Sequence, residues 1–336
     1  MNHWNWKTAL GASLFAASAL LAGCGDKTAP ADKTGAAPQA KAAPADTEQQ
    51  QIEKYNIYVD VSNNLRTSFQ QAREEYVAQQ VPLLQAKAPL TSLHIQNDIL
   101  IDRSAKKLDT AAAIGAPMPE IDESAKAFSA ALKVLSPLSR ELNNYANSKG
   151  YLADNGDKAR QMNTDYLAAL TSVAKAEAAF DDGLSARDRA LTKEAFEKAP
   201  KDTAAYYRAG LIYHGKLNHA DANALFESPN DPKALAAFEA SLALVAQSAE
   251  GWSRKMGEQS AKSGKVCDGG MLKINEFIGQ SRSMVKDIKD GVFKRKESGA
   301  MARLPAHMRS SSIVNSANRY NQNFANMIGQ FNHPLC

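Results

Sequence analysis

From residue 51 to the C-terminus the apolar residues recur at intervals of three and four, and this spacing limits the fold more than any other feature of the chain. Between residues 51 and 80 the repeat is formed by Tyr58, Val61, Leu65, Phe69, Ala72 and Tyr76. Intervals of three and four place side chains on one face of an α-helix, whereas a half-buried strand needs strict alternation. No segment alternates in this way for long, so the sequence predicts an all-α fold.

Proline, glycine and polar clusters divide the pattern into separate helices. After the first helix we expect further helices over about residues 90–114, 119–149, 157–199, 203–226, 232–263, 271–292 and 313–331. Pro137 predicts a kink within its helix, and Gly215 marks a place where the helix over 203–226 could break. Narrow apolar stripes on helices of this length are typical of antiparallel bundles. The predicted architecture is therefore an elongated antiparallel bundle of long helices.

The segment around Gly150 indicates an elbow between two of these helices. Gly150 follows the last polar turn of the helix over 119–149, where a glycine with positive φ commonly ends a helix. Asp154, Asn155 and Asp157 then offer side-chain oxygens that can cap the next helix. We expect a left-handed Gly150, at which any larger residue would be strained.

The composition supports a packed helical core. Hydrophobic residues make up 44% of the chain and aromatic residues 7%, and alanine is abundant. Few aromatics and many alanines favour closely packed helices over a β-sandwich. The formal net charge is +4, and a balance so close to neutral does not favour nucleic acid as a partner.

The N-terminal residues have the composition of a secretory signal. Residues 1–7 carry the α-amino charge and Lys7, and residues 8–22 carry no charge over a length short of a spanning helix. The sequence Leu21-Ala22-Gly23-Cys24 resembles the lipobox of bacterial lipoproteins. This resemblance implies cleavage before Cys24 and attachment of acyl chains such as palmitate, which would hold the protein on a membrane. The alternatives are an ordinary signal peptide with a chance cysteine and an uncleaved anchor helix.

Residues 24–50 are rich in Ala, Pro, Lys and Asp and contain no large apolar residue. Such a segment cannot bury enough apolar surface to offset the entropy lost on ordering, so we expect a disordered tether. Gly25 follows the cysteine, and the first acidic residue is Asp26. By resemblance to enterobacterial sorting, this favours the periplasmic face of the outer membrane over the inner membrane. The expected domains are a signal peptide over 1–23, a tether over 24–50 and an α-helical periplasmic domain over 51–336.

Several short motifs accompany the lipobox. They are Tyr55-Asn56 at the opening of the domain, Glu141-Leu142-Asn143-Asn144-Tyr145 leading to Tyr151 and Asp154, and the close Asn318-Arg319-Tyr320-Asn321-Gln322-Asn323. Together they resemble the YiiG-like lipoproteins, a bacterial family of uncharacterised function, over about residues 51–331. The resemblance implies a secreted helical domain and implies no catalytic residues.

Two cysteines remain if Cys24 is lipidated. Cys267 lies in a loop bracketed by Gly264 and Gly269-Gly270, and Cys336 is the last residue. An even pair in an oxidising compartment predicts a disulfide that closes a loop of about 70 residues and holds the C-terminus. The alternative is two free thiols that never meet.

The stretch 282–309 holds eight Lys or Arg residues against three Asp or Glu residues, a local net charge of +5. Its centre is Lys294, Arg295 and Lys296, which we consider as a contact for anionic lipid or cell-wall polymer. The alternative, which we favour, is a solvated face that binds nothing.

The sequence contains no convincing catalytic or metal site. His214 and His219 are five residues apart, so on one helix they would point about 140° apart, and we expect solvent-facing histidines. Apolar and aromatic residues form every strong stripe, and the carboxylates fall on outward positions. We therefore expect no enzyme activity, no metal and no cofactor.

The functional hypothesis is a membrane-anchored envelope lipoprotein whose helical domain binds another envelope protein or a cell-wall component. One alternative is a periplasmic small-ligand-binding or sensor module with a pocket between helices. A less favoured alternative is a hydrolase whose nucleophile and base are not recognisable from their spacing.

Overall fold

The computed structural model describes residues 44–331, apart from residues 66, 87, 97 and 295–311. Within this part every regular element is a helix, so the predicted all-α fold is confirmed. The described residues form two compact units, the first ending at Arg187 and the second beginning at Asp188. The sequence predicts one helical domain over 51–336, and the boundary between the two units lies within a single long helix.

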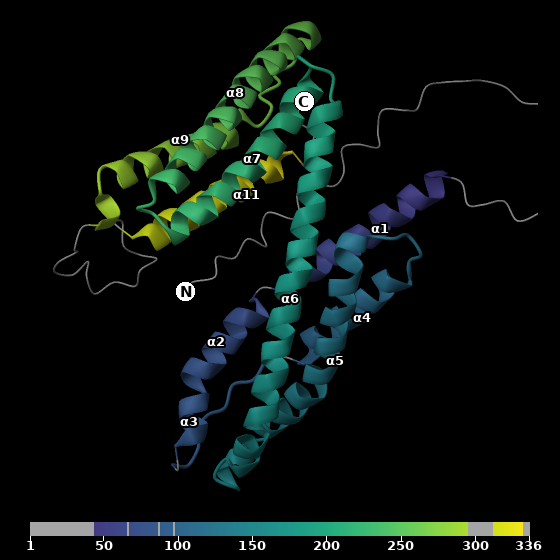
Figure 1. The fold of residues 1–336 in the computed structure, drawn as a ribbon, viewed down its shortest axis with the longest axis vertical. Helices are drawn as coiled ribbons and strands as arrows, with labels where there is room; N and C mark the ends of the chain where they lie inside the picture. Colours follow the sequence, from purple (N-terminus) through teal and green to yellow (C-terminus); the bar gives the residue numbers. More distant parts are fainter. Residues whose placement is uncertain (1–43, 66, 87, 97, 295–311, 332–336) are drawn as a thin grey trace, which may run out of the picture. The chain divides into compact units, whose positions relative to one another are not determined.

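The first unit is built mainly from α-helices (Figure 1). Its elements are α1 (Pro44–Asn64), α2 (Phe69–Gln79), α3 (Val81–Gln85), α4 (Asp98–Ala113), α5 (Pro119–Asn147), the short η2 (Gly150–Leu152) and the first part of α6 (Asp157–Lys198). Tyr58 meets Phe180 edge to face with ring centroids 5.7 Å apart, and Phe69 meets Phe128 in the same way at 6.1 Å. These four rings are fully buried, and burying each contributes about 1.5–3 kcal/mol.

The stripe predicted as one helix over 51–80 is divided between α1 and α2. α1 begins at Pro44, inside the predicted tether, and α2 begins after Ser68, whose hydroxyl accepts the N–H of Gln71 at 3.1 Å. All six apolar residues of the predicted stripe are buried. The sequence thus identified the buried face but missed the break. The next long helix, α4, begins at Asp98 and not near residue 90.

The predicted elbow is correct in one part and wrong in another. Gly150 does not adopt a positive φ; the left-handed residue is Lys149, with φ of 53°. A side chain at Gly150 would instead collide with Tyr145, because a Cβ there would lie 2.5 Å from the Cδ2 of that ring. Asp154 does cap α6, since its carboxylate accepts the N–H of Gly156 at 2.9 Å and that of Lys158 at 3.2 Å.

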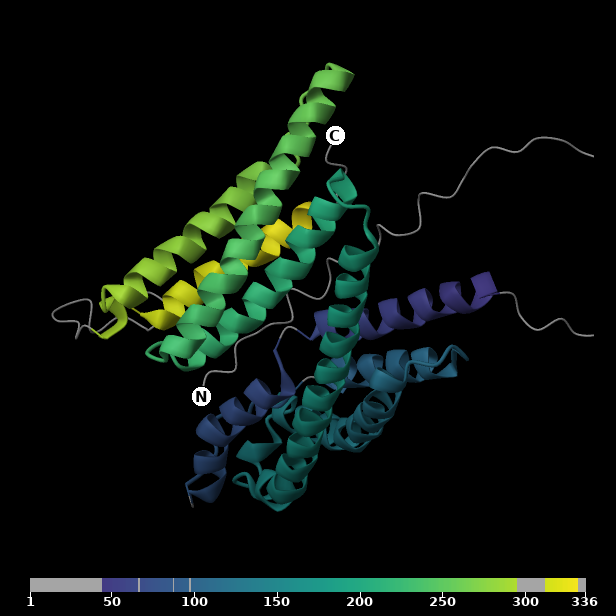
Figure 2. The same cartoon turned by 45° about the horizontal axis from the view of Figure 1, so that its top comes forward.

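The second unit contains a bundle of four long helices that lie side by side in both views (Figures 1 and 2). They are α7 (Ala204–Glu227), α8 (Pro232–Ser263), α9 (Met271–Lys289) and α11 (Ile313–Gln330). The second unit also includes the end of α6 and the short η3 (Val292–Lys294). α7 runs unbroken through Gly215, and α5 of the first unit continues through Pro137.

Tyr320 of α11 lies at the centre of this bundle. It is fully buried and contacts the rings of Phe226, Phe238 and Phe277, which come from α7, α8 and α9. The turn before α8 has the predicted form, with Pro232 at the first helical position and the Asp231 carboxylate accepting the N–H of Lys233 at 2.9 Å. Tyr320 therefore contacts an aromatic side chain from each of the other three helices.

Candidate functional site

The structure describes few of the residues that the sequence singled out. Cys24, Arg295, Lys296 and Cys336 lie outside the described residues. Lys294 is the last residue of η3, but its side chain also lies outside the described part. The predicted lipidation and the predicted contact through Lys294, Arg295 and Lys296 therefore stay predictions.

Cys267 lies in the loop between α8 and α9. Its N–H donates to the Ser260 hydroxyl at 2.8 Å, and two residues further on the carbonyl of Gly269 accepts the indole N–H of Trp252 at 2.8 Å. These bonds fasten the loop to α8, and the cysteine is 7% exposed. Because Cys336 lies outside the described residues, the disulfide stays a prediction.

The described part of the basic stretch is paired with acidic residues. The Lys286 ammonium contacts the Asp290 carboxylate, and Lys289 donates to the Glu239 carboxylate at 2.5 Å. Both lysine side chains are more than half exposed, so water weakens these ion pairs. These contacts fit the solvated-face interpretation.

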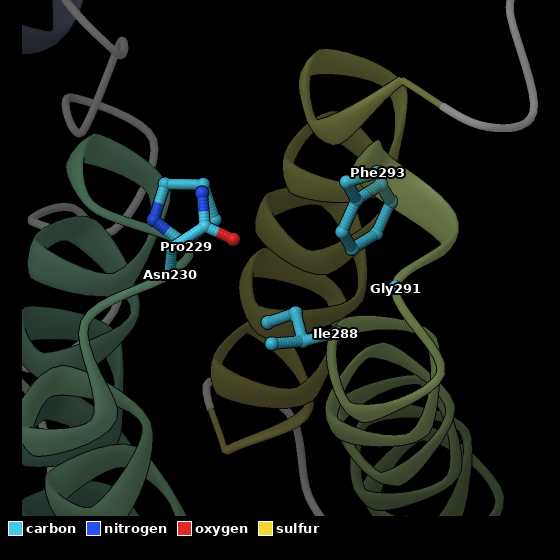
Figure 3. A pocket seen from close by; sticks show the side chains of 5 residues that line it. All are labelled: Pro229, Asn230, Ile288, Gly291 and Phe293. Atoms are coloured by element: carbon cyan, nitrogen blue, oxygen red, sulfur yellow. The ribbon is translucent and has the colours of Figure 1, made fainter. Parts of the chain in front are cut away.

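A small pocket lies at one end of the second unit (Figure 3). It is lined by Pro229 and Asn230 of the α7–α8 turn, Ile288 of α9, and Gly291 and Phe293 beyond it. Its volume is about 30 Å³, enough for a water molecule or two, whereas sites for small molecules span about 300–1,000 Å³. This pocket therefore does not suit a metabolite-sized ligand.

A lysine and an aspartate form a buried pair in the first unit. Lys54 of α1 is 3% exposed; its ammonium lies 2.8 Å from the Asp122 carboxylate and donates to the carbonyl of Ala116 at 2.9 Å. Asp122 also accepts the Tyr58 hydroxyl and the N–H of Met118, both at 2.9 Å. Lys54 and Tyr58 thus join α1 to the start of α5, whereas the bond from the Met118 N–H lies within the first turn of α5.

Acidic residues are also buried along α6, contrary to the prediction that carboxylates face outward. Glu177 accepts the N–H of Phe69 at 2.6 Å, and Asp181 accepts the Ser62 hydroxyl at 3.0 Å. Further along, Asp188 accepts the Lys216 ammonium with both oxygens at 2.6 Å, and each of these two side chains is 9% exposed. The prediction considered only the spacing of the apolar residues. The three acidic residues are themselves four and seven residues apart, so they lie on one face of α6.

His214 of α7 is buried and His219 is half-buried with both ring nitrogens inside, so the prediction of solvent-facing histidines is wrong. His214 is 9% exposed and its Nδ1 lies 3.0 Å from the Ser248 hydroxyl of α8. His219 stacks on Phe324 of α11 with ring centroids 4.5 Å apart and 6° between the planes. Burial lowers the pKa of both imidazoles, that of His219 to about 4, so both rings are neutral at pH 7.

The α7–α11 seam, defined here as the contact of these two helices around Gly215, His219, Asn223, Asn321 and Phe324, has two different sides. On one side Asn218 of α7 is fully bonded: its amide donates to the Phe238 carbonyl and the Ser241 hydroxyl, and its oxygen accepts the Tyr320 hydroxyl at 2.8 Å.

On the other side of the seam are polar atoms that are buried but lack a hydrogen-bond partner in the described part of the chain. They are both ring nitrogens of His219 and the Oδ1 atoms of Asn223 and Asn321. Buried polar atoms are rarely left unpaired in folded proteins. We therefore consider this side of the seam the candidate functional site. In the sequence, the one signal for it is the asparagine run over 315–332, which is unusual for a helix because asparagine is a poor helix former.

Each helix in the described residues is too short or too polar to span a bilayer. No group of three or more His, Cys, Asp or Glu side chains in this part of the chain is arranged to hold a metal ion.

Comparison with known families gives one match. The family described as "Protein of unknown function (DUF3829)" matches residues 49–333, which is most of the chain. The chain belongs to this family. The match begins within α1 and ends beyond α11, so both compact units are part of the family's common region.

No curated protein and no solved structure matches the chain. The family assignment supplies no residue roles, so the roles considered for this DUF3829 protein come from its own side chains.

Proposed function

We propose that the protein is a lipid-anchored bacterial envelope protein that acts by binding and not by catalysis. The observation that carries the proposal is the sequence Leu21-Ala22-Gly23-Cys24 after an uncharged run, followed by a low-complexity segment before the helical region. Acyl chains on Cys24 would supply the membrane affinity, at about 0.8 kcal/mol for each buried methylene. The finer resemblance to YiiG-like lipoproteins supports the same location.

The buried charges support a binding role over catalysis. Lys54, Asp122, Asp188 and Lys216 each take part in bonds that join one helix to another. A catalytic group needs a polar atom directed at a substrate in a cleft, whereas these atoms are used within the fold. The exterior, reached from a tether on the periplasmic face of the outer membrane, is then the surface that meets a partner.

Lipidation can be tested by metabolic labelling with a clickable palmitate analogue. We expect the wild type to be labelled and Cys24→Ser to be unlabelled and released from the membrane fraction. Cys267→Ser is the matched control, because it removes a thiol elsewhere and should keep the label. Equal labelling of wild type and Cys24→Ser would disprove the anchor.

A small-ligand or sensor role is the main alternative, and a hydrolase is the less favoured one. The first predicts that the purified protein carries or binds a metabolite in a pocket between helices. The second predicts turnover in a broad hydrolase screen that is lost on substituting a nucleophile. Either result would replace the proposed binding role while leaving the lipid anchor unaffected.

A further inference from the structure

We propose that Asn155 is a site of spontaneous deamidation, and that the turn between α5 and α6 controls how fast this modification occurs. The proposal goes beyond the proposed function and does not depend on the lipid anchor at Cys24. Asn155 is exposed and is followed by Gly156, and no other asparagine in the sequence is followed by glycine. Because glycine has no Cβ, its main-chain nitrogen is the least hindered of any residue. Asn155 is therefore the asparagine whose sequence favours the reaction most.

The reaction joins the main-chain nitrogen of Gly156 to the side chain of Asn155. The nitrogen loses its proton to a base in the solvent and attacks the Cγ atom of Asn155. A C–N bond forms, the bond from Cγ to the side-chain nitrogen breaks, and ammonia leaves with a proton from the solvent, which gives a five-membered succinimide. Water then opens this ring at one of its two carbonyls and leaves aspartate or isoaspartate at position 155. Water is the only co-reactant.

The folded turn keeps the two reacting atoms apart. Asn155 has a φ of 56° and Gly156 has a φ of 88°. The N–H of Asp157 donates to the Asp154 carbonyl at 3.2 Å, and two successive positive φ values within such a bond are characteristic of a type I′ turn. In this turn ψ of Asn155 is about +30°, which places the Gly156 nitrogen opposite Cβ across the Cα–C bond. The succinimide needs both atoms on the same side, so the turn must open before the reaction.

Side-chain hydrogen bonds hold the turn closed. The Asp154 carboxylate accepts the N–H of Gly156 at 2.9 Å, so the attacking nitrogen keeps its proton while this bond lasts. The same carboxylate accepts the Tyr145 hydroxyl, and the Arg160 guanidinium donates to the Asn155 carbonyl. Opening of the turn breaks these bonds, so the rate of deamidation follows the fraction of molecules in which the turn is open.

The products would weaken the turn that controls their formation. Either product adds a negative charge at position 155, between the carboxylates of Asp154 and Asp157, and like charges at short range repel. Isoaspartate also adds a methylene group to the main chain, which changes the geometry that the hydrogen bond from Asp157 to Asp154 requires. The modification would therefore loosen the start of α6 and would not reverse when the turn closes again.

The first experiment follows the purified full-length protein in detergent at mildly alkaline pH by peptide mass spectrometry. We expect conversion of the Asn155 amide to a carboxyl group to be at least tenfold faster in urea-unfolded protein than in folded protein. Asn147, which is exposed and followed by Ser148, is the internal control and should react at least tenfold more slowly than Asn155 in the unfolded protein. Equal rates at Asn155 in folded and unfolded protein, or no reaction at Asn155 when unfolded, would overturn the proposal.

The second experiment tests the turn within the folded protein. Asp154→Ala removes the hydrogen bond to the Gly156 N–H and should raise the rate at Asn155 at least tenfold, because a hydrogen bond to a charged group is lost. Tyr145→Phe removes only the hydroxyl that Asp154 accepts and keeps the buried ring, so it should raise the rate by a smaller factor. Thr203→Ala removes a cap of the same kind in the second unit and is the matched control, with an unchanged rate at Asn155.

Circular dichroism verifies that each variant remains folded. If Asp154→Ala does not fold, Tyr145→Phe decides the question. An equal rise in rate in Thr203→Ala would show that the reaction follows the general stability of the protein and not this turn. Unchanged rates at Asn155 in the folded variants of Asp154 and Tyr145 would show that the turn does not control the reaction. Either result would overturn the proposal.

Discussion

At the scale of single residues, the buried Lys54–Asp122 pair of the first unit carries a desolvation cost that its hydrogen bonds must offset. Removing a charged side chain from water is costly, and the cost is offset only where every charged atom has partners. Lys54 has Asp122 and the Ala116 carbonyl, while Asp122 has Lys54, Tyr58 and Met118. Loss of one partner leaves the other charge buried.

We therefore expect Asp122→Ala to lower the free energy of unfolding by about 3 kcal/mol, at the lower end for a broken buried pair because the aspartate side chain is 20% exposed. Urea denaturation measures this difference. Asp60→Ala, which breaks the exposed pair with Lys107, is the control and should cost at most about 1 kcal/mol. Similar losses in both variants would contradict the importance of burial.

The same pair predicts how stability depends on pH. Burial alone would raise the pKa of Asp122, but hydrogen bonds from Lys54, the Met118 N–H and Tyr58 hold this pKa below its usual range. A carboxyl whose pKa is lower in the folded state stabilises the fold above its unfolded pKa, and that contribution is lost as pH falls through the folded pKa. Between about pH 5 and pH 2 the free energy of unfolding should fall less in Asp122→Asn than in the wild type. An identical decline in the two proteins would count against this assignment.

Gly150 and Lys149 allow a second test at the residue scale. Gly150→Ala should destabilise the first unit by about 1–3 kcal/mol, because the new Cβ would overlap the Tyr145 ring. Lys149→Gly should be neutral or stabilising by up to about 1 kcal/mol, because Lys149 is the residue in the left-handed conformation. Thermal unfolding measures the stability of both variants. If Lys149→Gly were destabilised and Gly150→Ala were not, Gly150 and not Lys149 would be the helix cap.

At the scale of elements, the helix ends are held by short side chains that the sequence shows directly. Thr203 caps the start of α7: its hydroxyl oxygen accepts the N–H of Tyr206 at 3.1 Å and its hydroxyl donates to the Pro200 carbonyl at 2.6 Å. The first N–H groups of a helix have no partner within the helix, so a capping oxygen stabilises the whole element.

Removing this cap gives the element-scale prediction. Thr203→Ala should lower the free energy of unfolding by about 1 kcal/mol, and Thr203→Ser should restore most of that loss because serine keeps both hydrogen bonds. Chemical denaturation of the two variants is sufficient. If serine fails to rescue stability, the loss comes from the methyl group and not from the cap.

At the scale of the whole molecule, the described chain forms two units, each with its own aromatic core and its own buried lysine–aspartate pair. The predicted disulfide between Cys267 and Cys336 belongs to the second unit. It would close a loop of about 70 residues and contribute about 4 kcal/mol on the chain-entropy model.

Thiol counting under denaturing, non-reducing conditions tests this bond. With Cys24 lipidated we expect no free thiol in the wild type and one in either Cys267→Ser or Cys336→Ser. The single variants and the double variant should lose similar stability, because each lacks the same bond. Two free thiols in the wild type would show that the cysteines do not pair.

The helical class, most helix ends and the buried apolar faces followed from the sequence alone. They depend on local rules: the helical repeat places Phe238, Leu242 and Val245 on one face, and capping residues such as Asp231 act on the backbone next to them. The break between α1 and α2 was missed because the apolar spacing continues across it, and nothing local shows that the Phe69 N–H binds Glu177 of α6.

Only the tertiary structure decided which polar residues are inside. Whether an acidic or imidazole side chain can be buried depends on partners far away in the sequence, such as Lys216 for Asp188 and Phe324 for His219. The candidate site on the α7–α11 seam follows from the same fact, because Asn223 and Asn321 are almost a hundred residues apart and share a surface only when α11 folds against α7. The sequence by itself determined the helices and indicates the lipidation at Cys24 that we propose, whereas long-range packing determined which polar atoms have hydrogen-bond partners.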